Sequence, residues 1–128
     1  MTRRLYPARL TGRVTAPPSK SAWHRALICR FLAGQSLPEQ VSGDDVKHTL
    51  AGLRALQSGA PVVDCGDSGA TLRFLLPLAM ALGRRNMLFT GSPRLLERPL
   101  SAPYPVERTE RGYRAAAPLP PGWYALRG

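Results

Sequence analysis

The chain has 128 residues, 44% of them hydrophobic and 20% charged, which excludes disorder throughout and provides for only one hydrophobic core. Eighteen Lys and Arg against eight Asp and Glu give a formal charge of +10, which attracts anions. Nearly all of these cations are arginines, which bind carboxylates and phosphates through two hydrogen bonds, so anionic metabolites and nucleic acids both stay open as partners.

The N-terminal part predicts a short strand followed by a helix. Residues 9–15 alternate in polarity as a strand does, and the prolines after them end it. The next residues predict a helix over 19–33, with Ser19 as its cap and Gly34 as its stop. Neither here nor elsewhere is an apolar run long enough to cross a bilayer, so we expect a cytoplasmic protein without a membrane segment.

A helical projection of 19–33 separates an apolar face from a polar arc. The apolar face comprises Ala22, Trp23, Ala26, Leu27 and Cys29. The polar arc comprises Lys20, Ser21, His24 and Arg25. Cys29 and Cys65 lack the spacing of a zinc site, and we expect both to be buried free thiols.

A second helix is predicted after Ser42, with leucines at helical spacing, two aspartates in its first turn and an end at Gly59. The elements after it are, in order, a strand in 60–66, a helix within 66–83 that Pro77 kinks or shortens, a strand in 86–91, one or two helical turns in 92–100, and then strands and loops. This alternation of strands and helices is typical of an α/β fold.

The first candidate anion site lies where the helix over 19–33 begins. A helix N-terminus exposes unpaired N–H groups and a partial positive charge, and Lys20, Ser21 and Arg25 lie beside it. A solvated basic face explains the same residues equally well. His24 is interpreted as an exposed or hydrogen-bonded histidine, because a lone histidine on a helix is more often that than a proton donor.

The second candidate is the turn at 65–73. Gly66 and Gly69 let the backbone approach a ligand, and Arg73 follows one helical turn later. A tight turn between strand and helix also requires glycine, and Asp67 would repel an anion directly above it. We therefore expect the backbone from Gly69 onward to make the contact.

The third candidate is the segment 91–99, where Arg94 and Arg98 are four residues apart and Glu97 could orient one of them. A surface ion-pair network is the alternative. Cations at element ends recur in three separate segments, and we expect them to converge on one cavity.

Four motifs together resemble one known family. They are "PPSKSAWHRALICRFLA", "SGDDVKHTLAGLRAL", "DCGDSGATLRFLLPLAMAL" and "FTGSPRLLERPL". Over about 9–100 they are similar, in order and character, to the 5-enolpyruvylshikimate-3-phosphate synthases. The resemblance implies an α/β fold in which 1–128 is the N-terminal part of an enolpyruvyl transferase domain, built from repeated strand-helix units as an inside-out α/β barrel and ending before the second domain.

The family implies transfer of the enolpyruvyl group of phosphoenolpyruvate to the 5-hydroxyl of shikimate 3-phosphate, with release of phosphate and without metal or organic cofactor. By position, Lys20, Ser21 and Arg25 resemble the shikimate 3-phosphate contacts. Lys20, Gly69 and Arg98 resemble the phosphoenolpyruvate contacts, and Arg73 and Arg94 resemble residues just behind them. The family is usually monomeric, and no nucleic acid is expected.

The same resemblance sets limits on activity. The family's acid and base carboxylates belong to the second domain, so no catalytic residue is assigned here, and we expect this chain alone to be inactive. The hydroxyl that usually follows the second glycine is missing at Ala70 unless Thr71 replaces it. The alternatives are a non-catalytic remnant that keeps the fold and, less favoured, a basic nucleic-acid-binding module.

Overall fold

The computed structural model describes residues 3–4, 6–9 and 11–125. Its helices are α1 (Lys20–Leu32), α2 (Asp44–Ser58), α3 (Gly69–Ala81) and α4 (Pro93–Leu96). Its strands are β1 (Val62–Asp64), β2 (Leu88–Thr90), β3 (Val106–Thr109) and β4 (Gly112–Ala115). No helix in the described part of the chain is long and apolar enough to span a bilayer.

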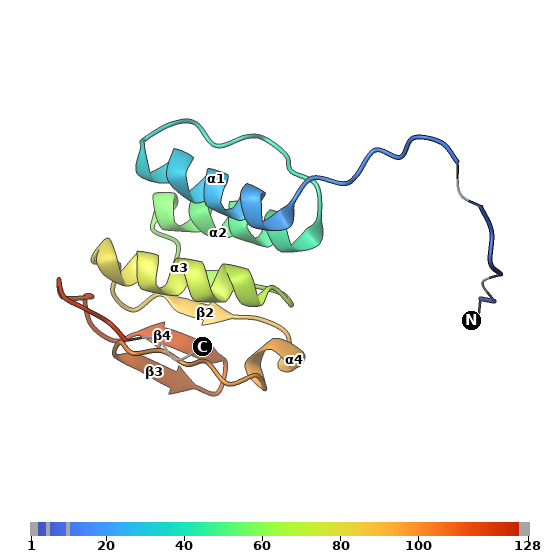
Figure 1. The fold of residues 1–128 in the computed structure, drawn as a ribbon. Coiled ribbons are helices and arrows are strands. Elements are labelled where there is room, and N and C mark those ends of the chain that lie inside the picture. Colours follow the sequence, from blue (N-terminus) through green and yellow to red (C-terminus); the bar gives the residue numbers. More distant parts are fainter. Residues whose placement is uncertain (1–2, 5, 10, 126–128) are drawn as a thin grey trace.

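The strands form one mixed sheet in the order β1-β2-β4-β3. β1 and β2 are parallel and are connected through α3, whereas β4 is antiparallel to both of its neighbours. Three helices are stacked over one face of the sheet, with α3 nearest to it and α1 outermost (Figure 1). α2 lies between α1 and α3 and also packs on β1. The α/β class that the sequence predicts is therefore confirmed, and the structure adds that the sheet is mixed.

The core lies between the sheet and the stacked helices. Phe89 on β2, Leu53 on α2 and Leu75 on α3 are completely buried. Gly52 permits close approach of α2 to α3, because a Cβ atom there would lie 2.4 Å from the Leu75 Cδ1 atom. The packing of apolar side chains from α2 and α3 against the sheet thus forms the centre of the fold, and the other elements pack around it.

Most of the predicted helix ends are confirmed. The Ser19 hydroxyl accepts a hydrogen bond from the Ala22 amide at 3.4 Å and caps α1. α2 ends at Gly59 in the left-handed conformation, with φ of 72°. Its cap is Gly43 rather than Ser42, because helical geometry begins one residue later than expected. α3 continues through Pro77, so the proline does not shorten it.

The predicted strand at residues 9–15 is wrong. Residue 9 and residues 11–15 form no strand and are exposed, and residue 10 lies outside the described residues. This segment extends away from the stacked helices (Figure 1), where no strand of the described chain is available to pair with it. A strand needs a hydrogen-bonded neighbour, which a local alternation of polarity does not supply.

The predicted apolar face of α1 is confirmed for Leu27, which is buried, and for Trp23, which is half-buried against the core, but it is wrong for the other three residues. Ala22, Ala26 and Cys29 are exposed, whereas His24 is buried together with Leu27. Where α1 meets α2, the buried His24 ring has a hydrogen-bonding partner in Thr49 of α2, so this polar side chain can face the core. Cys29 is therefore not the buried thiol that the sequence suggested.

Cys65 is the buried free thiol, as expected. Burial, together with the nearby Asp64 carboxylate, raises the pKa of Cys65 to about 12. The thiol consequently stays protonated near neutral pH and behaves as a small apolar side chain.

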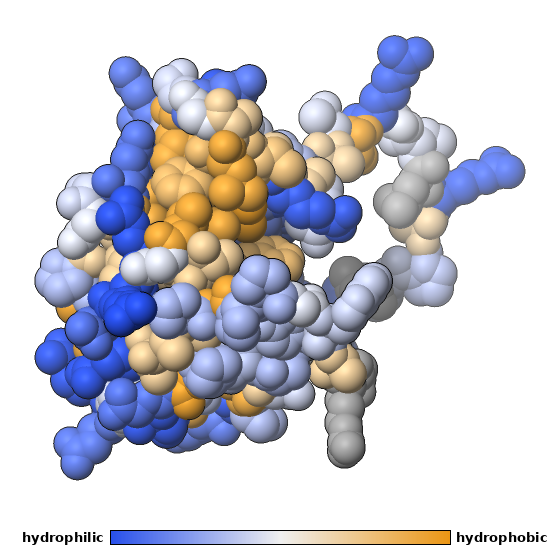
Figure 2. Space-filling model, turned by 90° about the vertical axis from the view of Figure 1, so that its left-hand side faces the viewer, coloured by the Kyte–Doolittle hydropathy of each residue, from blue (hydrophilic) through white to orange (hydrophobic). Residues whose placement is uncertain are grey.

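Apolar surface is exposed at the end of the molecule where α1 and α3 finish. Leu32 ends α1 and Leu82 follows α3, and both are exposed. Figure 2 shows apolar atoms gathered on this face, which is the left-hand side of Figure 1. The face lies opposite the end at which the helices begin.

Candidate anion-binding site

The helices α1, α2 and α3 all begin at the same end of the molecule (Figure 1). The parallel strands β1 and β2 also finish there, at Asp64 and Thr90. In α/β proteins ligands bind at this edge, because strand ends open into loops and helix N-termini present amide donors there. The predicted sites at 19–25, 65–73 and 91–99 all belong to this end.

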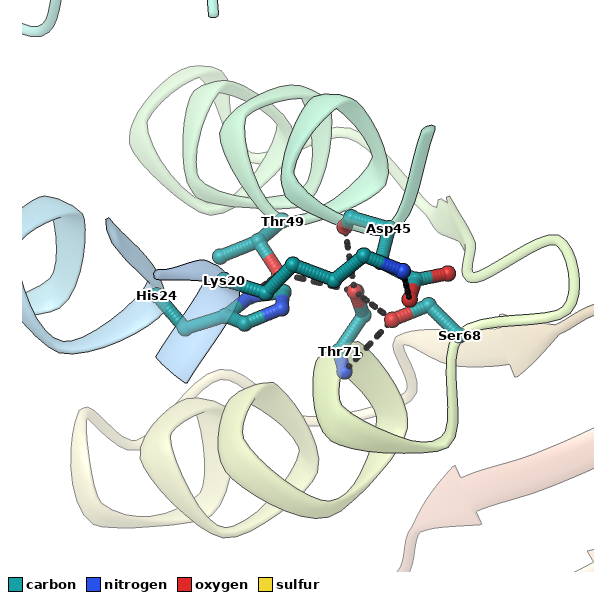
Figure 3. A network of polar contacts seen from close by, with 6 residues as sticks. All are labelled: Lys20, His24, Asp45, Thr49, Ser68 and Thr71. Atoms are coloured by element: carbon teal, nitrogen blue, oxygen red, sulfur yellow. Dashed lines mark hydrogen bonds and ion pairs between the residues drawn. The ribbon is translucent and has the colours of Figure 1, made fainter. Parts of the chain in front are cut away.

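A chain of buried polar groups joins the N-terminal halves of these three helices (Figure 3). His24 Nδ1 lies 2.7 Å from the Thr49 hydroxyl, which lies 2.7 Å from the Thr71 hydroxyl. The Thr71 hydroxyl donates to Ser68 Oγ at 2.7 Å, and Ser68 Oγ also accepts from the Thr71 amide at 3.1 Å. We call His24, Thr49, Thr71 and Ser68 the inter-helix network.

Lys20 reaches across the outside of the inter-helix network to Asp45. Its ammonium lies 3.1 Å from the Asp45 carboxylate, and Figure 3 shows this pair beside Ser68. The side chains are 67% and 37% exposed, respectively, so water screens their attraction and the pair contributes little to stability. An incoming anion can therefore compete with Asp45 for Lys20 at small cost.

The turns that follow β1 and β2 are tied together. The Cys65 amide donates to the Thr90 carbonyl at 2.8 Å, and the Ser92 amide donates to the Gly66 carbonyl at 2.9 Å. The Ser92 hydroxyl also donates to the Asp67 carboxylate. Asp67 is thus occupied by a hydroxyl beside the turn, which moderates its repulsion of an anion near Gly69.

A small hollow opens beside the start of α3. It is lined by Gly69, Leu72, Arg73, Leu95, Arg98, Pro99 and Leu100. A Cβ atom built on Gly69 would lie 3.0 Å from an Arg73 guanidinium nitrogen, so a glycine leaves room for this arginine against the backbone. The structure therefore brings together Gly69, Arg73 and Arg98 from two of the predicted segments.

Other predicted site residues lie elsewhere, so the expected single cavity is not observed. Lys20, Ser21 and Arg25 are exposed on α1, and Arg94 is exposed on α4; none of them lines the hollow. Within the described residues, the side chains of Arg25, Arg73, Arg94 and Arg98 have no hydrogen-bonding or ion-pair partner.

Two residues of this site, Asp45 and Thr49, are not predicted from the sequence. The orientation of an arginine by Glu97, which the spacing allows, is not observed, since Glu97 has no ion pair within the described residues. Asp45 was assigned only to the helix dipole, and its pairing with Lys20 spans 25 positions of sequence. The hydrogen bonds of Thr49 to His24 and Thr71 could not be predicted, because a single threonine among leucines does not indicate which residues it contacts.

Thr71 does not replace the hydroxyl that is missing at Ala70. Its side chain is completely buried, and its hydroxyl is directed to Ser68, to Thr49 and to the Asp45 carbonyl at 3.3 Å. Thr71 therefore holds the helices together and offers no group to the hollow. Among the described residues, no cluster of three or more His, Cys, Asp or Glu could hold a metal ion.

Burial lowers the pKa of His24 because the charged ring would lose its hydration; the Asp45 carboxylate acts in the opposite direction, and the Lys20 ammonium lowers the pKa further. Between this lowered pKa and the unfolded value of about 6.5, the unfolded chain binds a proton that the folded chain does not. The free energy of unfolding should therefore fall as the pH falls below about 6.5, by at most about 1.4 kcal/mol per pH unit from this residue.

Urea unfolding at pH 7.5 and pH 5.5 measures this effect. Between pH 7.5 and pH 5.5 we expect the free energy of unfolding to fall more in the wild type than in the His24→Asn variant. Asparagine keeps an N–H donor but does not titrate. Equal losses would show that His24 does not carry this pH dependence.

Comparisons with known proteins give one consistent result. A 3-phosphoshikimate 1-carboxyvinyltransferase of Clostridium kluyveri is 36% identical over 84% of this chain and 30% of its own length. Proteins of the same name from Clostridium perfringens and Clostridium acetobutylicum are 34% and 33% identical over 78% and 77% of this chain. This chain thus spans about 30% of the length of the curated relatives it matches. No protein-family model and no solved structure matches it.

Proposed function

We propose that this chain, which belongs by sequence to the 3-phosphoshikimate 1-carboxyvinyltransferase family, supplies anion-binding groups for enolpyruvyl transfer from phosphoenolpyruvate to the 5-hydroxyl of shikimate 3-phosphate. The observation that carries the proposal is the hollow at the start of α3, where the unpaired guanidinium groups of Arg73 and Arg98 flank Gly69. Both substrates carry a phosphate and a carboxylate, and arginine binds each of these with two hydrogen bonds.

The proposed contacts come from the start of α1, from the start of α3 and from the segment that follows α4. Lys20, Ser21 and Arg25 at the start of α1 bind shikimate 3-phosphate, and Gly69 and Arg98 bind phosphoenolpyruvate. Lys20 leaves Asp45 and contacts both substrates, which is favourable because its present ion pair is exposed and weak. Arg73 lines the same hollow as Arg98, so we extend the phosphoenolpyruvate contacts to it, and Arg94 stays behind them on α4.

These groups act by position and charge. In the reaction the substrate's 5-hydroxyl oxygen bonds to the substituted carbon of the enol, and the bond from that carbon to the phosphate oxygen later breaks. Cations fixed before the reaction stabilise the phosphate and carboxylate charges throughout both steps. They cannot move the protons, so the proposal assigns the proton transfers to carboxylates outside this chain and expects no activity from the chain alone.

The proposal also includes the finer architecture. Residues 1–128 form the N-terminal part of an enolpyruvyl transferase domain, whose repeated strand-helix units build an inside-out α/β barrel in a monomeric, cytoplasmic enzyme. The mixed sheet with helices on one face is compatible with one such part.

Titration calorimetry with shikimate 3-phosphate tests the proposal. We expect the wild-type chain to bind, and Lys20→Ala or Arg25→Ala to weaken binding about tenfold each, as loss of one hydrogen bond to a charged group does. Arg84→Ala removes the same charge beyond the far end of α3 and should bind as the wild type does. No heat at millimolar ligand in the wild type would contradict the proposal and favour a non-catalytic remnant.

A further inference from the structure

The inter-helix network is buried, although every member of it is polar. His24 is 3% exposed, Ser68 is 2% exposed, and Thr49 and Thr71 are fully buried. Buried polar groups cost free energy unless each finds a hydrogen-bonding partner, and here each member has one. Each of the three helices contributes to this network, α3 through Thr71 and its cap Ser68. The network is thus a directional connection between elements that apolar packing alone would leave free to shift.

The hydrogen atoms can be placed along the network. Thr71 has one hydroxyl hydrogen, and Ser68 Oγ at 2.7 Å is a better acceptor position than the Asp45 carbonyl at 3.3 Å. Because that hydrogen is used, the Thr49 hydroxyl must donate to Thr71. His24 must then donate its Nδ1–H to Thr49. A neutral His24 with its proton on Nδ1 satisfies every bond in the chain.

α1 depends on this connection more than the other helices do. Of its residues, all of which the structure describes, His24 and Leu27 are the buried ones. α2 and α3, by contrast, each bury several apolar side chains. Trp23, Ile28 and Phe31 also pack, partly buried, against the core and hold α1 on it without fixing a direction. The bond from His24 to Thr49, one helical turn from Lys20, is the directional contact that fixes α1 along α2.

We propose that His24 and Thr49 are positioning residues, which hold the first turn of α1 at a fixed distance from the first turn of α3. This fixes Lys20 relative to Gly69 without either positioning residue touching a ligand. The fixed distance between the starts of α1 and α3 is inferred from the inter-helix network alone. Its effect on substrate binding rests on the function proposed above.

Thr49→Val is the most direct test, because it removes the hydroxyl and keeps the shape of the side chain. Thr49→Ser restores the hydroxyl. The control is the Leu56 variant, Leu56→Val or Leu56→Ala, whose loss of unfolding free energy is closer to that of Thr49→Val. Leu56 is fully buried at the other end of α2, so the control separates positioning from general destabilisation.

The first measurement needs no ligand. In the wild type the Trp23 amide donates to the Ser19 carbonyl and the Thr71 amide donates to Ser68 Oγ, each at 3.1 Å. We expect hydrogen exchange of both amides to be faster in Thr49→Val than in the Leu56 control, and ¹⁵N spectra of His24 to lose the Nδ1–H signature only in Thr49→Val. Equal exchange in the two variants, with an unchanged His24, would overturn the proposal.

The second measurement is shikimate 3-phosphate affinity. Thr49→Val should bind about five- to tenfold more weakly than the control, and Thr49→Ser should bind as the wild type does. If Lys20→Ala weakens binding but Thr49→Val does not, the positioning role is wrong and the proposed function stands. If the wild type does not bind, the proposed function fails, and amide exchange alone decides on positioning.

Discussion

Replacing Phe89 by alanine is expected to lower the free energy of unfolding by about 3–5 kcal/mol. Phe89 is completely buried on β2, where it pairs with Val63 of β1 on one side and Tyr113 of β4 on the other. Its removal leaves a cavity between the sheet and α3 that these neighbours cannot fill. Because small domains are stable by only about 5–15 kcal/mol, this loss leaves little reserve.

Phe74→Ala is the matched control for this change. Phe74 is 42% exposed on α3, so the same truncation removes much less buried area. We expect a loss of about 1 kcal/mol or less from Phe74→Ala in urea unfolding followed by circular dichroism. Similar losses in both variants would show that β2 is not the centre of the core.

Removing both arginines of the hollow, in the double variant Arg73→Ala and Arg98→Ala, should weaken phosphoenolpyruvate binding about a hundredfold. Each guanidinium has no other partner within the described residues, so each is free to bind the anion. Hydrogen bonds to charged groups contribute about 1.5–3 kcal/mol, and two of them account for this factor. Isothermal titration measures it directly.

The control for the double variant removes two arginines elsewhere. Arg84→Ala with Arg111→Ala lowers the net charge by the same amount and leaves the hollow unchanged. If the two double variants bind equally weakly, the general positive field of the protein attracts phosphoenolpyruvate and the hollow is not its site.

Local rules predicted the helices well because the groups that begin and end a helix are close in sequence. Ser19 lies three residues before the amide it caps, and the same spacing holds for Ser68 and Ser92. Gly59 ends α2 for an equally local reason, since it adopts a positive φ at no steric cost.

The orientation of α1 could not be predicted in this way. A hydropathy pattern assigns the face with the most apolar residues to the core, so it predicts that Ala22 and Ala26 are buried and that the histidine is exposed. The burial of His24 depends on Thr49 and Thr71, which lie on other helices and enter no local pattern. The ion pair of Lys20 with Asp45 is likewise a product of helix packing.

The candidate site was predicted in its parts but not in its arrangement. Glycine and arginine in a turn before a helix indicated Gly69 and Arg73, and Arg98 was found from its spacing to Arg94. That Arg98 reaches the hollow of Gly69, while Arg94 does not line it, depends on how the turns after β1 and β2 are joined. Hydrogen bonds between distant segments decide this, and a single sequence does not reveal them.

Backbone amide spectra recorded during addition of phosphoenolpyruvate and shikimate 3-phosphate show whether anions bind where α1 and α3 begin. We expect the amide signals of Ser21 and Ala22 and of Gly69 and Ala70 to shift together and to saturate. Shifts confined to distant basic residues such as Arg84, Arg108 and Arg111, without saturation, would contradict this expectation.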